Sequence, residues 1–251
     1  MNRPKGKIVV LVVAIIVVFA LNFPVYWMFV QSITSESMFT ERPSLLPKAP
    51  SFDAFRRICE AKPMGQWFVN TLIVAVGTVV LSMPLAAGAA FSLSRYKTTL
   101  NSITGLAILG TQMLSASLLA IPIYVLFRRT GLHDKLGGLI VANTAFTLPM
   151  SIWVLKGFFD AIPKELDEAA MIDGCSVGQM IWKVIMPLVL PGIVAVSIFA
   201  FILAWDEFFF ARTLVTSQGN WVMSVGLSSF REEFTIQWSD MMAAAVLFTI
   251  P

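Results

Sequence analysis

The sequence predicts an all-α membrane protein, because its charged residues are few and its apolar residues stand in long runs. Hydrophobic residues make up 57% of the 251 residues and charged residues 13%, and the mean hydropathy is +0.78. A soluble domain carries about 25% charged residues, since its surface must be solvated. Charge this sparse cannot cover a globule of this length, so a lipid bilayer must cover much of its surface.

The net charge of +3 does not indicate a nucleic-acid-binding protein. The basic residues are scattered between apolar runs and form no face or block of the kind that binds nucleic acid. Such scattered basic residues are typical of the segments that flank membrane spans. We therefore expect no nucleic-acid partner.

Side chains that would support enzymatic chemistry or a metal site are scarce. His133 is the only histidine, and Cys59 and Cys175 are the only cysteines. The cysteines show no metal-ligand spacing, and one histidine argues against zinc sites and Ser–His or Cys–His mechanisms. No glycine-rich phosphate loop is present either. We expect no catalytic residue, metal or cofactor on this chain, so any ATP that drives it must bind to another chain.

The first long apolar run predicts a retained membrane helix from Ile8 to about Val30, after the basic stretch Met1–Lys7. A spanning helix needs about 20 apolar residues to cross roughly 30 Å of hydrocarbon. A signal peptide has an apolar region of only about 7–15 residues and a small-residue cleavage site. We expect this helix to be kinked near Pro24 and followed by an irregular, proline-punctuated surface segment, residues 31–64.

Four more apolar runs are long enough to span the membrane, and we expect prolines to interrupt the first and third of them. They are residues 67–93 with Pro84, 103–127 with Pro122, 136–159 with Pro149, and 184–215. The last run, 241–251, would be only about 16 Å long as a helix, which is half a bilayer. We therefore expect six transmembrane helices with the last one incomplete. We also expect the native chain to continue past Pro251, because a chain that ends in hydrocarbon leaves carbonyls unpaired.

The segment 160–187 predicts a short exposed helix, a turn and a second helix that leads into the membrane. Pro163 suits a first helical turn, and the acidic residues that follow it complement the helix dipole. Gly174 stands where a helix ends in a left-handed residue. Ser176 can cap the second helix, and Pro187 is expected to break it.

Two roles for this segment stay open from its residues alone. It is either an interfacial helix that rests among lipid headgroups or a helix that enters a groove on a partner protein. Its acidic first half is unfavourable against anionic lipid, and its alanines are small enough to enter a groove. These features favour docking to a protein.

The same segment resembles the EAA loop of bacterial ABC importer permeases. That pattern is E-A-A, three residues, G, nine residues and I-x-L-P. Here it reads Glu168-Ala169-Ala170, then Gly174, then Val184-Ile185-Met186-Pro187. Val184 replaces Ile and Met186 replaces Leu. The surrounding residues IPKELDEAAMIDGCS are similar to the carbohydrate branch of the family, in which Ile-Asp-Gly commonly follows the alanines.

The likeness extends over residues 67–251. AWDEFFFARTL, residues 204–214, resembles the Trp-Asn-Glu-Phe signature of maltose-type second permeases, with Asp206 where Asn is more usual. WSDMMAAAVLFTIP resembles the start of the family's last helix. The resemblance implies a type I ABC importer permease fold. Residues 1–65 would hold the first transmembrane helix and an external segment, and residues 66–251 the type-1 core with its coupling loop at 160–187.

The resemblance also implies a function. The coupling helix would enter a groove on a cytoplasmic ATPase through residues Glu168, Ala169, Ala170, Asp173 and Gly174. This would fix the N-terminus in the cytoplasm, which the distribution of basic residues leaves open. The partners would be a second permease subunit, two ATPase subunits that carry ATP and Mg, and an extracytoplasmic substrate-binding protein. The location would be the bacterial plasma (inner) membrane.

The expected solute is a sugar or a sugar-like molecule, imported by alternating access. An alternative is that the same machinery imports glycerol phosphate or another non-sugar solute. An intramembrane enzyme is disfavoured, because within the spans only Asp206 and Glu207 come near a pair of acids, and adjacent residues on a helix point about 100° apart. A structural membrane scaffold would not need the acidic helix and turn.

Candidate pathway or gate residues are polar or aromatic groups in the spans. Asp206 and Glu207 should lie roughly 30 Å along the fifth helix from Pro187. They would line the outer gate or contact sugar hydroxyls, with Trp205 as a stacking face, or they would be interfacial anchors, with Glu207 paired to Arg212. Two further candidates, which could instead form interhelical hydrogen bonds, are Asn70 and Gln112.

Overall fold

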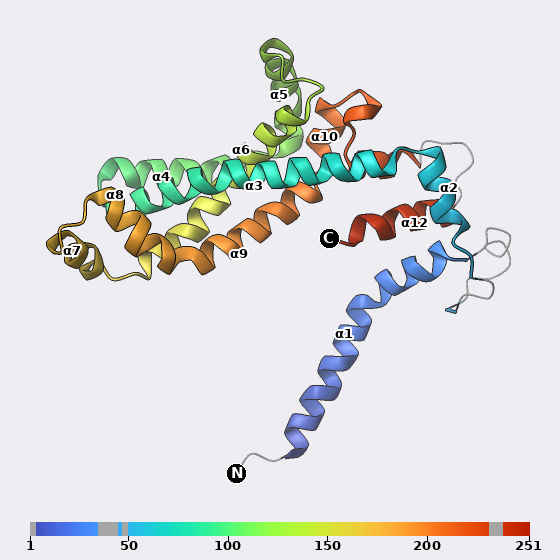
Figure 1. Cartoon of the computed structure of the whole chain (residues 1–251), viewed down its shortest axis with the longest axis horizontal. Coiled ribbons are helices and arrows are strands. Elements are labelled where there is room, and N and C mark those ends of the chain that lie inside the picture. Colours follow the sequence, from blue (N-terminus) through green and yellow to red (C-terminus); the bar gives the residue numbers. More distant parts are fainter. Residues whose placement is uncertain (1–3, 35–44, 47–49, 231–237) are drawn as a thin grey trace. The chain divides into compact units, whose positions relative to one another are not determined.

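The computed structural model describes residues 4–34, 45–46, 50–230 and 238–251. The described chain is helical and divides into two compact units (Figure 1). One unit comprises residues 1–68 and 226–251, and the other comprises residues 69–225. The all-α prediction is therefore confirmed.

The first unit contains α1 (Pro4–Ser32), α2 (Asp53–Ala61) and α12 (Trp238–Thr249). α12 packs against both α1 and α2. Arg57 of α2 forms an ion pair with Asp240 of α12, with Nη2 2.7 Å from Oδ1, and also donates to Ser239. α2 shows that the segment predicted to be irregular holds a helix, whose buried Ala54 and Ile58 form its apolar face.

α1 continues through Pro24 and leaves most of its described apolar side chains exposed. Its spanning part, Val10–Ser32, has a mean hydropathy of 2.4 and no buried residue in its most apolar stretch. A helical stretch that is apolar on every side and packs none of its faces against its own chain belongs in lipid or against another membrane helix. α1 therefore fits the retained membrane helix that the sequence predicts.

The second unit is built on helices that follow one another through short connections, and the first of them begins at residue 64, in the first unit. They are α3 (Met64–Arg95), α4 (Thr99–Thr111), α5 (Ala116–Thr130), α6 (Leu136–Asp160), α7 (Glu165–Ile172), α8 (Val177–Gln179), the π-helix η2 (Met180–Ile185) and α9 (Met186–Trp205). Shorter elements complete it: α10 (Phe209–Leu214), the 3₁₀ turn η3 (Gln218–Asn220) and α11 (Met223–Ser229), which ends beyond the unit boundary.

Small residues bring α3, α6 and α9 together in the core of this unit. Ala86, Ala90 and Ala200 are fully buried in one cluster with Leu155 and Phe159. At Gly192 of α9 a Cβ atom would lie 2.5 Å from the ring of Phe158, so no larger residue fits that crossing of α6 and α9. Close backbone approach at small residues is how helices pack in lipid, where no hydrophobic effect drives them together.

The prolines predicted to interrupt spans lie inside continuous helices. α3 runs through Pro84 and α6 runs through Pro149, and Pro122 lies inside α5. In α6 the side chain of Thr147 donates to the carbonyl of Asn143, and Ser151 donates to that of Thr147. These hydroxyl bonds lie on either side of Ala145, whose carbonyl has no helical donor at Pro149. Packing against neighbouring membrane helices lets a helix continue through a proline.

Two predicted spans are divided instead at polar residues. The run 103–127 forms α4 and α5, which are bent by 99° to each other. Ser115, in an extended conformation, caps α5 by accepting from the backbone N–H of Ser117. The run 184–215 ends as a helix at Trp205, and α10 starts afresh at Phe209. Cap chemistry, which hydropathy does not record, decides both boundaries.

The count of six transmembrane helices is not confirmed by the described residues. Four helices are long and apolar enough to cross a membrane, and the bent pair α4–α5 makes a fifth if it is a single span. α12 has 12 residues and is too short to span by itself, as predicted for the last run.

Candidate functional site

The loop between α6 and α9 folds as the sequence predicts. α7 starts at Glu165, two residues after Pro163, and carries three acidic residues in its first turn. Gly174 follows the helix with φ +83°, the left-handed conformation that glycine adopts without cost. Ser176 accepts from the backbone N–H of Gln179, while the Gln179 side chain accepts from the Ser176 N–H, so both sides of a capping box are present.

The second helix is not broken at Pro187, which corrects the sequence-based prediction. α8, η2 and α9 form one continuous helix from Val177 to Trp205. Just before the proline, the N–H of Met186 donates to the carbonyl of Ile181, five residues back. The π-turns widen the helix at the point where Pro187 lacks a donor, so the proline is accommodated inside it.

A buried arginine ties the base of α7 to the end of α3. Arg95 Nε lies 2.7 Å from Asp167 Oδ2, as an ion pair rather than an aligned hydrogen bond, and Nη2 donates to Oδ1 at 3.2 Å. Nη1 donates to the carbonyls of Phe159 and Ile162 at 3.3 and 3.1 Å. The side chains of Arg95 and Asp167 are only 6% and 16% exposed. One guanidinium thus holds the end of α6, the α6–α7 connection and α7 together.

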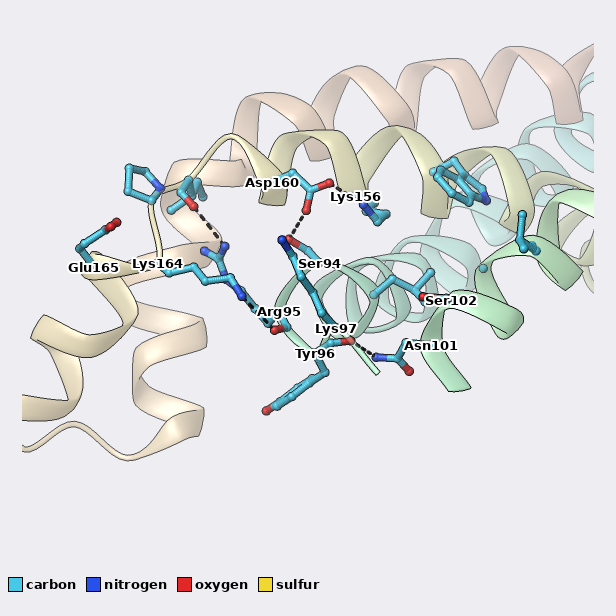
Figure 2. Close-up of a pocket in the computed structure, with 16 residues that line it drawn as sticks. Ser94, Arg95, Tyr96, Lys97, Asn101, Ser102, Lys156, Asp160, Lys164 and Glu165 are labelled. Atoms are coloured by element: carbon cyan, nitrogen blue, oxygen red, sulfur yellow. Dashed lines mark hydrogen bonds and ion pairs between the residues drawn. The ribbon is translucent and has the colours of Figure 1, made fainter. Parts of the chain in front are cut away.

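Further polar contacts reinforce the same junction. Ser94 donates to Asp160 Oδ1 at 2.6 Å, and Lys156 pairs with Asp160 Oδ2 at 2.5 Å. Lys164 Nζ donates to the carbonyl of Arg95 at 3.2 Å (Figure 2). Hydrogen bonds and ion pairs therefore join the end of α3 to the end of α6 and to the α6–α7 connection. They fix the base of α7, which projects from this junction.

Most of the predicted coupling residues lie on the free side of that projection. Glu168, Ala169, Asp173 and Gly174 are exposed, and only Ala170 is buried, in the cluster formed with α6 and α9. Two large apolar side chains also point outward beside them, because Met171 is 54% exposed and Ile172 85% exposed. An exposed face that mixes acidic, small and apolar groups on a rigid base suits docking into a protein groove.

The structure separates the three residues at the end of α9. Trp205 is 6% exposed, and its ring stacks on Phe201 with centroids 5.6 Å apart. Asp206 is exposed at the C-cap of α9. The carboxylate of Glu207 accepts from the backbone N–H groups of Phe210 and Ala211 at 2.7 and 3.0 Å. Glu207 therefore caps the start of α10, an arrangement that the sequence analysis did not anticipate.

Asn70 and Glu207 converge on one segment, residues 219–224. The Asn70 amide donates to the carbonyls of Gly219 and Trp221 at 2.9 and 2.8 Å, and Asn70 is 7% exposed. Ser224 in turn donates to the carbonyl of Glu207 at 2.7 Å. These groups are used to hold the connection between α10 and α11.

Gln112 lies at the break between α4 and α5 and is exposed. Its amide makes a long hydrogen bond, 3.4 Å, to the carbonyl of Phe146. The ring of Phe146 packs on that of Phe210, with centroids 4.5 Å apart. Gln112 and Asp206 are thus the two pathway candidates whose side chains are exposed on the described chain.

Asp134 is a structural hub that sequence reasoning missed. It has φ +56°, and its carboxylate accepts from the backbone N–H groups of Thr216 and Ser217 and from the Ser217 hydroxyl. Burial by itself raises the pKa of Asp134, but the hydrogen bonds from Ser217 and Thr216 outweigh it and hold the pKa below its ordinary value. The only sequence signal was an Asp after Gly131, in a position that favours turns.

The described residues contain no group of three or more His, Cys, Asp or Glu side chains that could hold a metal ion. What the α6–α9 loop offers is a rigid protruding helix linked covalently to the long helix α8–α9 and by Arg95 to α3. Such an arrangement can pass a mechanical displacement into the membrane helices.

Comparison with known proteins places this geometry in a family. The family described as "Binding-protein-dependent transport system inner membrane component" matches residues 3–251. The chain is 34% identical over 249 residues to the diacetylchitobiose uptake system permease protein DasC of Streptomyces coelicolor, covering 98% of this chain and 90% of that protein. It is 32% identical over 231 residues to the trehalose transport system permease protein SugB of Mycobacterium tuberculosis, covering 91% of this chain and 84% of that protein.

The fold is shared with a solved structure as well. A chain from the crystal structure of a bacterial ABC transporter involved in the import of the acidic polysaccharide alginate superposes with a TM-score of 0.82. The match covers 100% of this chain and 95% of that chain at 24% sequence identity. This multi-pass membrane chain, with its anchored α7, therefore belongs to the family of binding-protein-dependent transport system inner membrane components.

Proposed function

We propose that this chain is one of two permease subunits of an ATP-driven importer and forms half of the transmembrane path for a sugar or sugar-like solute. The observation that carries the proposal is α7, whose base is fixed by the Arg95–Asp167 pair and whose Glu168–Gly174 face is exposed. One of two cytoplasmic ATPase subunits would take up that face in a groove. Both ATPase subunits would also bind ATP and Mg, while an extracytoplasmic protein would deliver the solute.

In the proposed mechanism this chain performs no covalent chemistry. Closure of the ATPases on ATP would displace α7. Because α7 is crosslinked to α3 through Arg95 and packs on η2, the displacement would reach α3 and the α8–α9 helix as rigid bodies. The two permeases would then alternate between inward-open and outward-open states, with the N-terminus of this chain in the cytoplasm.

The sugar class is supported by the names of the relatives, which are uptake systems for diacetylchitobiose and trehalose. Import of glycerol phosphate or another non-sugar solute by the same machinery is the alternative, and the relatives do not favour it. Within the chain, the exposed Asp206 and Gln112 are the candidates for contact with the solute path. Trp205 and Asn70, both buried, would support its wall.

Co-purification tests the assembly. The full chain, tagged and extracted from its native membrane, should retain a second permease of the same family and an ATPase, with two copies of the ATPase for each copy of this chain. Ile172→Cys, in a background with Cys59→Ser and Cys175→Ala, should crosslink to the ATPase through a short bifunctional thiol reagent. Trp238→Cys, on α12 and 49% exposed, is the matched control and should give no such adduct.

Uptake into proteoliposomes tests the solute. The complex with its binding protein should accumulate an oligosaccharide in an ATP-dependent way and should ignore glycerol phosphate. A purified assembly that lacks an ATPase would refute the importer function. Uptake of glycerol phosphate alone would refute only the sugar class.

A further inference from the structure

A pocket of about 790 Å³ opens beside the base of α7 (Figure 2). It lies among the end of α3, the α3–α4 turn, the first turns of α4 and the last turns of α6. Its polar lining comes from these helix ends, including Arg95, Lys97, Lys156 and Lys164. The coupling role proposed for α7 does not use this pocket.

The lining carries an excess of positive charge. Four basic residues face two acidic ones, Asp160 and Glu165, which leaves a formal excess of two. Arg95 is compensated by Asp167, outside the lining, and Lys156 is compensated by Asp160. Lys164 donates to a neutral carbonyl, and Lys97 makes no ion pair with any residue of the described chain. Lys97 acts on Asp160 only through space, and Glu165 is the remaining acidic residue of the lining, so Lys97, Lys164 and Glu165 together leave a net positive charge that can attract an anion.

The other side of the pocket is apolar. Leu93 lies two residues before the end of α3, and Leu106 lies two turns into α4. Trp153 lies seven residues before the end of α6, about 10 Å deeper than Asp160 along the helix. Lys156 Nζ lies 5.8 Å from the centre of the Trp153 ring, which places a cation at the junction of the two zones. Gly105 keeps the wall open, because it has no side chain beside the Trp153 ring.

The order of these zones along the helix axes matches the structure of a phospholipid at a membrane surface. The basic groups stand at the ends of helices that span the bilayer, where headgroups lie, and the apolar wall stands deeper, where acyl chains begin. Basic pockets between membrane helices are suited to anionic headgroups. This matching does not depend on which side of the membrane the pocket faces.

We propose that this pocket binds an anionic glycerophospholipid, with its phosphate between Lys97 and Lys164 and an acyl chain along Leu93, Leu106 and Trp153. The bound lipid lies against the residues that hold α7, since Arg95 and Lys164 belong to both sets. It would therefore brace the junction between α3 and α7. A soluble phosphate would use the same two lysines but would leave the apolar wall without an occupant.

The test uses the complete assembly in nanodiscs with equal amounts of phosphatidylglycerol and phosphatidylcholine. Lipids retained after detergent transfer are then counted by native mass spectrometry. The wild type should retain phosphatidylglycerol preferentially. Lys97→Gln and Lys164→Gln should each reduce the ratio of retained phosphatidylglycerol to phosphatidylcholine about five-fold, which corresponds to about 1 kcal/mol per basic residue near an anionic surface. Lys183→Gln removes an exposed charge beside α7 but outside the lining, and should leave the ratio unchanged.

A variant that fills the pocket distinguishes the effect of the basic residues from the effect of the space for the lipid. Ser102 is exposed on the pocket wall, so Ser102→Trp should expel the lipid while all four basic residues remain. An unchanged lipid ratio in the Lys97→Gln/Lys164→Gln double variant would overturn the proposal. So would displacement of the lipid by excess inorganic phosphate, or retention only by chains from which the ATPase has been stripped. Each of these results leaves sugar uptake as an independent measurement, so failure here is distinct from failure of the importer function.

Discussion

The guanidinium of Arg95 and the carboxylate of Asp167 form a buried ion pair across 72 residues of sequence, with Nε 2.7 Å from Oδ2. The same guanidinium donates to two carbonyls of the α6–α7 connection. Breaking a buried pair by removing one partner leaves an uncompensated charge, which is more damaging than losing an exposed pair. This contact is therefore where a local change should alter how α7 transmits motion.

Asp167→Ala should destabilise the chain by about 3–5 kcal/mol, because Arg95 keeps its charge in a buried position. Arg95→Lys keeps the charge but loses the forked geometry, and should reduce solute uptake more than ATP hydrolysis. Thermal unfolding measures the stability, and assays on the assembled complex measure the rates of solute uptake and ATP hydrolysis. Arg56→Lys, in an exposed pair with Glu60, is the control and should change none of them appreciably. Equal losses of uptake and hydrolysis in Arg95→Lys would show that the contact maintains the structure and does not couple the ATPase to transport.

Gly174→Pro should abolish uptake while leaving membrane insertion intact. Proline requires φ near −65°, whereas this position has φ +83°, so the turn after α7 cannot form. Gly174→Asn is the matched control, since asparagine tolerates the left-handed region, and should retain most of the uptake. Full uptake by the proline variant would contradict the coupling role of α7.

Asp206→Ala should change the rate or solute range of uptake without lowering the unfolding temperature, since Asp206 is exposed. Glu207→Gln should lower the unfolding temperature without changing the rate or solute range of uptake. Its carboxylate caps α10, and replacing the charged acceptor costs about 0.5–2 kcal/mol of stability. Unfolding curves and uptake assays over a panel of sugars separate the two. Wild-type kinetics in Asp206→Ala would identify this residue as an anchor at the membrane interface.

Asp134 should make stability depend on acid pH. Its pKa lies below the ordinary value of 3.8 in the folded chain, so its contribution is fully present above that value and is lost as the pH falls through the folded pKa. Asp134→Asn tolerates φ +56° but removes the charge, and should lower the unfolding temperature at pH 7. The gap between wild type and variant should close below about pH 3.8. A gap that persists unchanged at pH values well below 3.8 would show that the carboxylate charge does not stabilise this junction.

The local features of the α6–α9 loop could be predicted because each depends on neighbours in sequence. The acidic first turn, Gly174 and the Ser176 cap act within one or two turns of helix, and the structure shows each of them in the expected place. Pro163 lies just before the N-cap of α7 and not in its first turn. The sequence wrongly predicted breaks within helices at Pro84, Pro149 and Pro187. A proline kinks or ends a helix in water, but here π-turns precede Pro187, and a membrane helix can continue through a proline where it packs against neighbouring helices.

The sequence by itself determined that this chain lies in a membrane and that its acidic loop carries the family's coupling pattern, because composition and fixed spacing are properties of the chain. Only the tertiary structure decided that Arg95 holds Asp167, that Glu207 caps α10 instead of acting as a membrane acid, and that Asp134 joins the loops at residues 131–135 and 214–220. The contacts of Arg95 and Asp134 unite groups from distant parts of the chain, whereas the Glu207 cap is local and depends on where α9 ends. Their partners are set by how the long helices pack, and that packing depends on shape at residues such as Gly192 rather than on any local pattern.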